Sequence, residues 1–348
     1  MRRTAKRAMG LACGLAAAVG VAACGDGEGS GDSASGSGGS AQITLYNAQH
    51  EDLMKLMVGA FTKQTGIKVQ MRSGEDLELA NQLVQEGKAS PADVFVTENS
   101  PGMTLVDARN GFATLDGATL AQVPARYAAA NRHWVGFAAR ATVLAYNKTR
   151  LTTAQLPASI MDLADPQWKG KVGYSPTGAD FQAIVSAVVA LKGQAAGKAW
   201  LEGLKRNAVA YKGNSRVMKA VNDGDLAAGV IYHYYWYQDQ AESGANSDNV
   251  KLHFFGHQDP GAFTSVSGAG VLASSRHAAE AQRLVKFLTG KEGQQVLAGS
   301  AALEYPVGSG VAADKALKPL AALDAPAVDV TRLNSDTVVT MMQDAGIL

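Results

Sequence analysis

The sequence predicts an α/β fold built from two lobes. β-prone runs and helical repeats alternate from Ala41 onward, and the alternation starts again near Thr142 without an internal repeat. The chain has 348 residues, of which 47% are hydrophobic and 18% are charged. This balance is typical of a globular protein, and the length is sufficient for two lobes.

The N-terminus is typical of a targeting segment. Four basic residues within the first seven positions precede an apolar stretch, 8–23, which is too short and too rich in Ala and Gly to span a bilayer comfortably. The stretch ends in Val-Ala-Ala before Cys24, a pattern that resembles the bacterial lipobox. We therefore predict that residues 1–23 are a lipoprotein signal peptide and that Cys24 is the lipidated first residue of the mature chain. A plain signal peptide is the alternative.

Residues 24–40 are predicted to form a tether. After Cys24 this segment contains only Gly, Ser, Asp, Glu and a single Ala. Such a composition buries no apolar surface, so we expect a flexible linker. The predicted result is a folded body held near a membrane.

The first lobe is expected to span residues 41–141 and to be completed by about 265–315. Its strands are predicted at 43–46, 67–71 and 93–97, and its helices at 53–66 and 77–87. In the first helix Leu53, Met57 and Phe61 recur at helical spacing, and Gly66 stands where a C-cap is expected. The strand–helix order indicates a sheet that begins with parallel strands.

The second lobe is expected to span residues 142–264 and to be completed by about 316–348. Its strands are predicted at 142–146, 171–174 and 228–232, with a helix after Ala179. A strand at 267–272 and a helix over 281–288 follow. Two such lobes on a secreted body predict a clamshell of the periplasmic-binding-protein type, which takes ligand between its lobes. A single hydrolase-like α/β domain is the alternative that secondary structure leaves open.

Composition and motifs argue against several classes of function. The formal net charge of +1 gives no indication of nucleic-acid binding. Both cysteines, Cys13 and Cys24, precede the predicted fold, so the mature fold is expected to have no disulfide and no thiolate metal site. The chain has no phosphate-binding Gly-Lys-Ser/Thr loop, no Gly-x-Ser-x-Gly elbow and no metalloprotease spacing of histidines. We therefore predict that the protein is not an enzyme.

Two polar residues stand just past predicted strand ends, where α/β sheets place functional groups. His50 follows the first strand and Glu98 follows the third. Each also has an ordinary interpretation, His50 as a surface residue and Glu98 as a charge at a helix start.

The segment 231–237 is unusual because five of its seven residues are aromatic in a protein that is 7% aromatic. It contains the pair Tyr234 and Tyr235. Three interpretations remain open, which are an aromatic wedge in a core or hinge, a wall that binds a cation or a sugar, and metal ligation by phenolates. Ligation by adjacent tyrosines requires the backbone to leave strand geometry, because successive strand side chains diverge.

Five blocks of the sequence resemble the bacterial ferric-iron-binding proteins of ABC importers, in that family's order and over essentially the whole chain from Ala41. The blocks are Tyr-Asn-Ala-Gln-His at 46–50, Ala-Asp-Val-Phe-Val-Thr-Glu at 92–98, Trp-Lys-Gly-Lys at 168–171, Tyr-Tyr-Trp-Tyr at 234–237 and His-Gln-Asp-Pro-Gly-Ala at 257–262. The resemblance implies a type II-like clamshell. Each lobe would be a mixed sheet flanked by helices, with hinge strands between the lobes.

The resemblance also implies that Tyr234 and Tyr235 bind iron as phenolates, together with Glu98 and His50. This ligand set suits ferric iron, a hard ion that prefers anionic oxygen and accepts imidazole. Two phenolates and one carboxylate balance its three positive charges. Because the pKa of tyrosine is normally near 10, iron must displace protons, and binding should weaken in acid.

Family members usually complete the coordination with a small anion such as phosphate or carbonate. The predicted anion site contains Thr177, Gly178 and Ala179 before a helix, where free N–H groups attract anions, together with Asn214 and Asn99.

Two departures from the family affect this anion site. Tyr232 stands where Asn is common, and Asp180 adds a negative charge beside the cradle. His233 is interpreted as a neighbour of the site and not as a ligand.

The function implied is capture of ferric iron and its delivery to an ABC permease in the cytoplasmic membrane. The protein is expected to be a monomer, anchored to the outer face of that membrane by lipid on Cys24. The alternative is a binding protein for an organic cation or oxyanion, such as a polyamine, thiamine or a phosphonate, that uses the aromatic run.

Overall fold

The computed structural model describes residues 41–308 and 310–348. The predicted signal peptide, Cys24 and the tether at 24–40 lie outside the described residues. Within the described ranges, none of the helices combines the length and the hydropathy that crossing a membrane requires.

The described residues contain ten strands that form one connected sheet in the order β2-β1-β3-β9-β4-β7-β5-β6, with β8 and β10 also paired to β4. The strands are β1 (Gln42–Asn47), β2 (Lys68–Ser73), β3 (Val94–Val96), β4 (Val135–Asn147), β5 (Val172–Tyr174), β6 (Val209–Ala210), β7 (Ala228–Tyr232), β8 (Val250–His253), β9 (Thr264–Val271) and β10 (Tyr305–Pro306).

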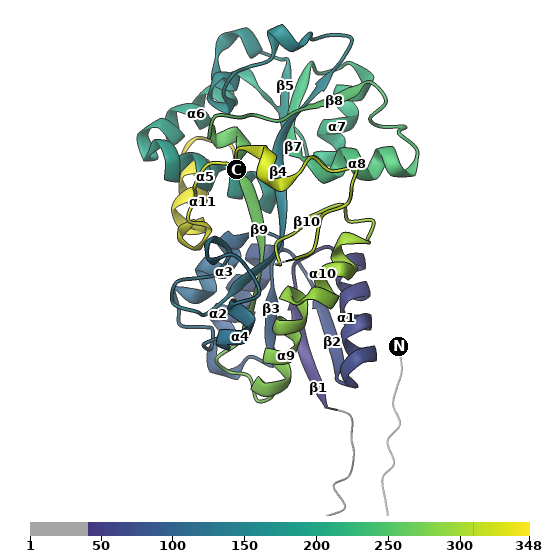
Figure 1. The fold of residues 1–348 in the computed structure, drawn as a ribbon. Helices are drawn as coiled ribbons and strands as arrows, with labels where there is room; N and C mark the ends of the chain where they lie inside the picture. The colour runs from purple at the N-terminus through teal and green to yellow at the C-terminus, as the bar shows by residue number, and fades with distance from the viewer. Residues whose placement is uncertain (1–40, 309) are drawn as a thin grey trace, which may run out of the picture. The chain divides into compact units, whose positions relative to one another are not determined.

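Helices flank this sheet in both lobes (Figure 1). The α-helices are α1 (Glu51–Thr65), α2 (Asp76–Glu86), α3 (Ser100–Asp107), α4 (Gly117–Leu120), α5 (Ala179–Lys192), α6 (Gln194–Asn207), α7 (Asn214–Asp223), α8 (His233–Glu242), α9 (Ala278–Thr289), α10 (Lys291–Ala298) and α11 (Ser335–Asp344). The 3-10 helices are η1 (Gly87–Ala89), η2 (Ala125–Tyr127), η3 (Thr153–Gln155), η4 (Ile160–Ala164), η5 (Pro166–Trp168), η6 (Pro260–Ala262), η7 (Leu320–Leu323) and η8 (Val330–Arg332).

The long strand β4 joins the two lobes. Its first part, up to Ala141, pairs with β9 and β10, and its second part, from Thr142, pairs with β7 and β8. In Figure 1 the lower lobe contains β1–β3 with α1–α4, α9 and α10, and the upper lobe contains β5 and β7 with α5–α8. Parallel pairs within each lobe and antiparallel pairs along β4 and β9 make the sheet mixed. The predicted two-lobed α/β clamshell is confirmed.

The predicted helices and strands of the first lobe are present. In α1 the side chains of Leu53, Met57 and Phe61 are buried, and Gly66 caps the helix at a φ of 73°, where its N–H donates to the carbonyl of Thr62. A residue with a Cβ is disfavoured in this left-handed conformation, which explains the glycine.

The prediction for β4 was too short. Only 142–146 was expected to be a strand, whereas β4 runs over 13 residues, all of them buried. A strand buried on both faces does not alternate between polar and apolar residues, so its first half gives no clear pattern. Arg140 also interrupts the apolar run there. The limits of the two lobes along the chain stay a proposal, which the change of partners after Ala141 supports.

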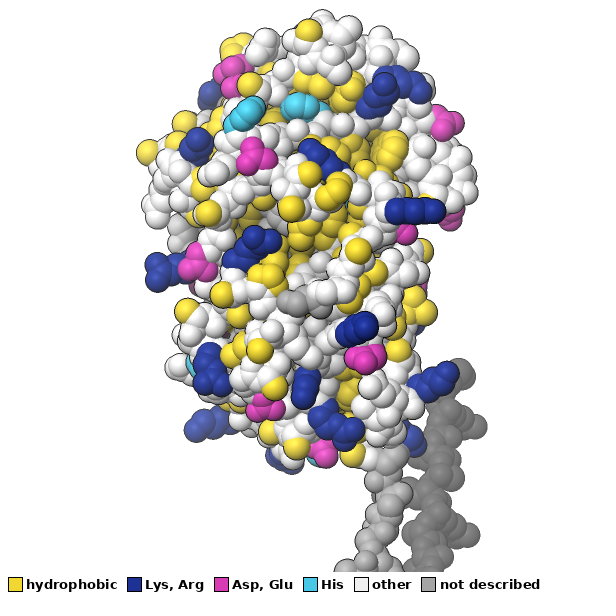
Figure 2. Space-filling view, in the orientation of Figure 1, with side chains coloured by type: hydrophobic (Ala, Val, Ile, Leu, Met, Phe, Trp, Pro, Cys, Tyr) yellow, Lys and Arg dark blue, Asp and Glu magenta, His cyan; other side chains and the backbone are white. Residues whose placement is uncertain are grey.

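Charged side chains of both signs are dispersed over the described part of the face drawn in Figure 2.

α11 packs against α5 and α6 of the upper lobe and against α3 of the lower lobe. The C-terminal helix therefore contacts both lobes.

Candidate metal centre

The first half of the site lies at the carboxyl ends of two parallel strands. β1 and β3 are paired, so the residues that follow them meet at one edge of the sheet. His50 follows β1 at the start of α1, and its Nε2 atom lies 3.4 Å from Oε1 of Glu98, which follows β3. The carboxylate of Asp76, at the start of α2, accepts the N–H groups of Glu98 and Asn99, each at 2.8 Å. This pair of hydrogen bonds fixes the backbone that carries Glu98.

The second half of the site lies where β7 ends and α8 begins. The strand ends at Tyr232, so Tyr234 and Tyr235 extend from the first turn of the helix. Their rings are stacked with centroids 4.2 Å apart. The Tyr234 hydroxyl donates a hydrogen bond of 3.1 Å to Oε1 of Glu98. The change from strand to helix is the break in regular strand geometry that ligation by adjacent tyrosines requires.

The four predicted ligands are therefore brought together from both lobes. Oε1 of Glu98 lies 3.4 Å from Nε2 of His50 and 3.1 Å from Oη of Tyr234. Adjacent donor atoms around an octahedral ion with bonds of about 2.0–2.1 Å are about 3 Å apart, so these spacings suit a shared metal ion. Among the described residues, no three His, Cys, Asp or Glu side chains are placed to hold a metal by themselves.

Asp180 occupies the position beside the tyrosines. It lies in the first turn of α5 and is 6% exposed. Its carboxylate accepts hydrogen bonds from Nδ2 of Asn99 at 3.1 Å, from Nδ2 of Asn214 at 2.7 Å and from the Tyr235 hydroxyl at 3.3 Å. Two of the predicted anion contacts, Asn99 and Asn214, are therefore directed at a carboxylate of the protein itself.

The remaining residues of the predicted anion site form part of a neighbouring cavity. Thr177, Gly178 and Ala179 line a cavity of about 330 Å³ together with residues 75–78 at the start of α2. Tyr232, the other departure from the family pattern, is buried and donates to the backbone carbonyl of Asp180 at 3.4 Å. Tyr232 thus supports the segment that carries the carboxylate.

The rest of the aromatic run does not form a wall around the site. The Nδ1 atom of His233 accepts the N–H of Ala141 at 3.1 Å, and its ring stacks on Tyr305 with centroids 4.8 Å apart. Trp236 donates from its indole to the carbonyl of Val250 at 3.0 Å. These side chains serve the hinge and the core of the upper lobe.

Two buried charged residues behind the site were not predicted. Arg140 on β4 and Glu304 before β10 are fully buried and form an ion pair, with Nη2 2.8 Å from Oε2. Arg140 also donates to the backbone carbonyl of Glu98, and Glu304 Oε1 lies 3.0 Å from Nδ1 of His50. The available signal was an arginine inside an otherwise apolar run.

Burial and neighbouring charges shift the pKa values of most of the donor groups. Burial together with the charges of Asp180 and Glu98 raises the pKa values of Tyr234 and Tyr235 well above 10. Burial also raises the pKa of Asp180 to about 7 and raises that of Glu98. Burial opposes the charged form of His50, but Glu304 and Glu98 raise its pKa to about 9. In the metal-free protein these donors hold protons more tightly than usual.

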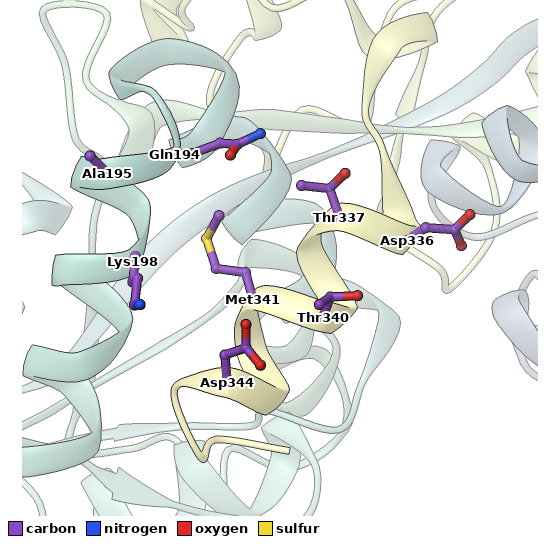
Figure 3. A pocket seen from close by; sticks show the side chains of 8 residues that line it. All are labelled: Gln194, Ala195, Lys198, Asp336, Thr337, Thr340, Met341 and Asp344. Atoms are coloured by element: carbon purple, nitrogen blue, oxygen red, sulfur yellow. The ribbon is translucent and has the colours of Figure 1, made fainter.

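A larger pocket lies away from this centre. Its volume is about 610 Å³, and it is lined by Gln194, Ala195 and Lys198 from α6 and by α11 residues between Asp336 and Asp344 (Figure 3). None of the predicted site residues lines it. It therefore offers positions for control substitutions.

Two α/β lobes joined by a shared long strand, with donor atoms from both lobes meeting between them, define a solute-binding protein of the clamshell class. A model of bacterial extracellular solute-binding proteins matches residues 89–332. The Fe(3+)-binding periplasmic protein of Serratia marcescens is 59% identical over 306 residues, which cover 88% of this chain and 90% of that protein. The chain belongs to the family of bacterial extracellular solute-binding proteins.

Other relatives agree with this assignment. The major ferric iron-binding protein of Neisseria meningitidis serogroup B is 38% identical over 88% of this chain and 93% of its own length. The structure of iron-bound HitA from Pseudomonas aeruginosa has a TM-score of 0.83 at 43% identity, and covers 88% of this chain and 99% of that one. A Trichodesmium protein in complex with iron and citrate has a TM-score of 0.77 at 27% identity, over 88% of this chain and 100% of that one. The predicted resemblance to ferric-iron-binding proteins is confirmed.

Proposed function

We propose that this protein captures ferric iron between its lobes and delivers it to an ABC importer. The observation that carries the proposal is the meeting of His50, Glu98 and Tyr234, with donor spacings of 3.1–3.4 Å, next to Tyr235, whose ring stacks on that of Tyr234. Phenolate and carboxylate oxygens suit a hard trivalent ion. The relatives described above are named as ferric iron-binding proteins, which supports the same substrate for this chain.

We further infer that Asp180 is a protein ligand in the place of a synergistic anion. Its carboxylate receives the amide groups of Asn99 and Asn214, which were predicted to hold phosphate or carbonate. With Glu98 and two phenolates it supplies a fourth negative charge, and the guanidinium of Arg140 lies 3.8 Å from Glu98 Oε1. A free anion in the same place would face an unfavourable like charge.

The two halves of the centre give a simple capture mechanism. Tyr234, Tyr235 and Asp180 belong to the upper lobe, and His50 and Glu98 to the lower lobe. An ion held by both sets favours the closed clamshell, because only the closed form makes all the bonds. Opening by the permease would break the lower-lobe bonds and weaken iron binding, and protonation of the remaining donors would release the ion.

The cellular setting is proposed from the N-terminal sequence. Lipid on Cys24 would anchor the protein to the outer face of the cytoplasmic membrane, and the tether at 24–40 would let a monomer reach the permease. The alternative ligand class, an organic cation or oxyanion, has less support because the relatives that cover most of this chain are named as ferric iron-binding proteins.

The test is a visible absorption titration of the iron-stripped protein with ferric citrate. A phenolate-to-iron charge-transfer band should saturate near one equivalent and should be absent from the Tyr234→Phe/Tyr235→Phe variant. Tyr237→Phe, in the same helix, is the matched control and should keep the band. The absence of a band in the wild type at neutral pH would reject phenolate ligation.

The role of Asp180 has its own test. Wild-type iron affinity should be independent of added phosphate or carbonate, whereas Asp180→Ala should bind weakly and recover affinity when either anion is added. A wild type that requires an anion would show that Asp180 does not replace it.

A further inference from the structure

The position of Glu304 is fixed by the strand that follows it and by the side chains around it. It directly precedes β10, whose antiparallel pairing with β4 matches Tyr305 to Ala139. Continuation of this register places Glu304 opposite Arg140. The preceding residue, Leu303, has a φ of 52°, a left-handed conformation that non-glycine residues rarely adopt. The backbone therefore accepts an unfavourable conformation directly before this carboxylate.

Both oxygens of the Glu304 carboxylate have partners. Oε2 lies 2.8 Å from Nη2 of Arg140 and 3.3 Å from Nε2 of Gln49, and Oε1 lies 3.0 Å from Nδ1 of His50. The side chains of Glu304 and Arg140 are completely buried. Arg140 Nη2 also donates to Oγ of Ser267 at 2.6 Å. The carboxylate is therefore fixed from one side by Arg140 and presents its other oxygen to the imidazole.

The chemistry of this contact determines which nitrogen of His50 faces the cleft. An ionised carboxylate only accepts hydrogen bonds, so Nδ1 of His50 must carry the hydrogen. In the neutral imidazole the lone pair is then on Nε2, the atom that lies 3.4 Å from Glu98 Oε1. Histidines that bind metals are commonly oriented by a carboxylate in this manner.

Arg140 also contacts Glu98, the second proposed ligand from the lower lobe. It donates to the backbone carbonyl of Glu98, and its Nη1 lies 3.8 Å from the Glu98 carboxylate. Glu304, Arg140, Glu98 and His50 thus form a closed ring of contacts made entirely within the lower lobe. The tyrosines of the upper lobe are not needed to hold it.

We propose that Glu304, held by Arg140, is a positioning residue that orients His50 with Nε2 toward the ferric ion, so that the lower lobe presents a preassembled half-site. This inference rests on the proposed function. Glu304 does not touch the ion. It acts through His50, and its contribution to iron affinity should disappear when His50 is removed.

The experiment is a double-mutant cycle on iron affinity with His50→Ala and Glu304→Gln, measured by competition with citrate. Glu304→Gln alone should weaken iron binding by about 10- to 100-fold, the range typical for loss of an orienting partner. In the His50→Ala background the same substitution should change affinity by less than about threefold. Equal losses in both backgrounds would show a general structural role and would overturn the proposal.

A second measurement keeps the proposal testable if Glu304→Gln folds poorly because it leaves Arg140 unpaired. The wild-type protein loaded with gallium(III), a diamagnetic trivalent ion, allows nitrogen NMR of the imidazole. We expect His50 to carry its hydrogen on Nδ1 and to bind the ion through Nε2. Binding through Nδ1 would overturn the proposal.

The outcomes also separate this inference from the proposed function. Absence of the charge-transfer band in the wild type would reject the function itself. A normal wild-type band together with an additive cycle would reject only the role of Glu304.

Discussion

At the scale of single residues, the buried carboxyl of Asp180, a proposed iron ligand, lowers the stability of the metal-free protein when it is ionised. Its buried carboxyl has a pKa of about 7, above the ordinary 3.8, so the folded metal-free protein binds more protons than the unfolded chain between about pH 4 and 7. Stability attributable to this group therefore falls as the pH rises through that window. A carboxylate suited to a trivalent ion is unfavourable when the ion is absent.

Asp180→Asn should consequently gain stability relative to the wild type as the pH is raised. We expect the difference in unfolding free energy between variant and wild type, measured by urea at pH 4 and at pH 8 without metal, to shift in favour of the variant at pH 8. Iron affinity should fall at the same time. Asp344→Asn, an exposed aspartate of the α11 pocket, is the control. A difference independent of pH would contradict the assigned burial of the charge.

Proton release on iron binding follows from His50 and the two tyrosines. The pKa of His50 is about 9 and those of Tyr234 and Tyr235 are well above 10, so at pH 7 each donor carries a proton that iron must displace. Release of about three protons per iron is expected from these groups, and Asp180, with a pKa of about 7, adds about half a proton at pH 7. Iron affinity should therefore fall by at least about 1000-fold for each unit by which the pH is lowered near neutrality.

Potentiometric titration during iron loading measures this release directly. His50→Ala should release about one proton fewer than the wild type. If this variant releases as many protons as the wild type, His50 is not protonated in the metal-free state or does not bind the ion.

At the scale of secondary-structure elements, the start of α8 is tied to the hinge. His233, next to the tyrosine pair, accepts the N–H of Ala141 at 3.1 Å, at the residue where β4 changes partners between the lobes. Its ring also stacks on Tyr305 of β10. Burial lowers the pKa of His233 to about 3, so the ring is neutral and able to accept. The helix that carries the phenols therefore begins at the pivot of the clamshell.

His233→Phe should keep the aromatic stack but leave the Ala141 N–H without its acceptor. A buried donor without a partner costs about 1–3 kcal/mol, so the free energy of unfolding in urea should fall by that amount. Tyr237→Phe, which leaves the hydrogen bond intact, serves as the control. An unchanged unfolding free energy would mean that the hydrogen bond does not contribute to stability.

The same elements indicate what could be predicted from sequence. Periodicity located the ends of the first-lobe strands, and α/β sheets place functional groups there, so His50 and Glu98 could be selected as candidates. Tyr234 and Tyr235 drew attention because the aromatic run is rare, but their proposed role as ligands came from the family resemblance. Glu304 was missed because it reaches its partner His50 across 254 positions, and no local pattern records such a contact.

Arg140 was missed for a related reason. It reaches Glu304 across 164 positions, and β4 is buried along its whole length. A lone charge within a buried strand has no period, so its partner becomes visible only when the sheet is assembled.

At the scale of the whole molecule, the lobes contribute unequally to the proposed centre. The upper lobe supplies Tyr234, Tyr235 and Asp180, which are three anionic oxygen donors when ionised. The lower lobe supplies Glu98 and His50. Three negative charges are sufficient to balance ferric iron, so the upper lobe should hold the ion by itself, whereas the lower lobe should mainly convert that binding into closure.

This division predicts that substitutions can separate the phenolate-to-iron absorption band from the closure of the two lobes. The His50→Ala/Glu98→Ala variant should retain the phenolate-to-iron band with reduced affinity, but iron should no longer decrease its radius of gyration in X-ray scattering, because no lower-lobe donor remains to close on the ion. Tyr234→Phe/Tyr235→Phe should lose both the band and the compaction. If the double alanine variant still compacts on iron binding, closure is driven by contacts other than the ligands. If this variant shows no charge-transfer band, the phenolates require the lower lobe to bind iron.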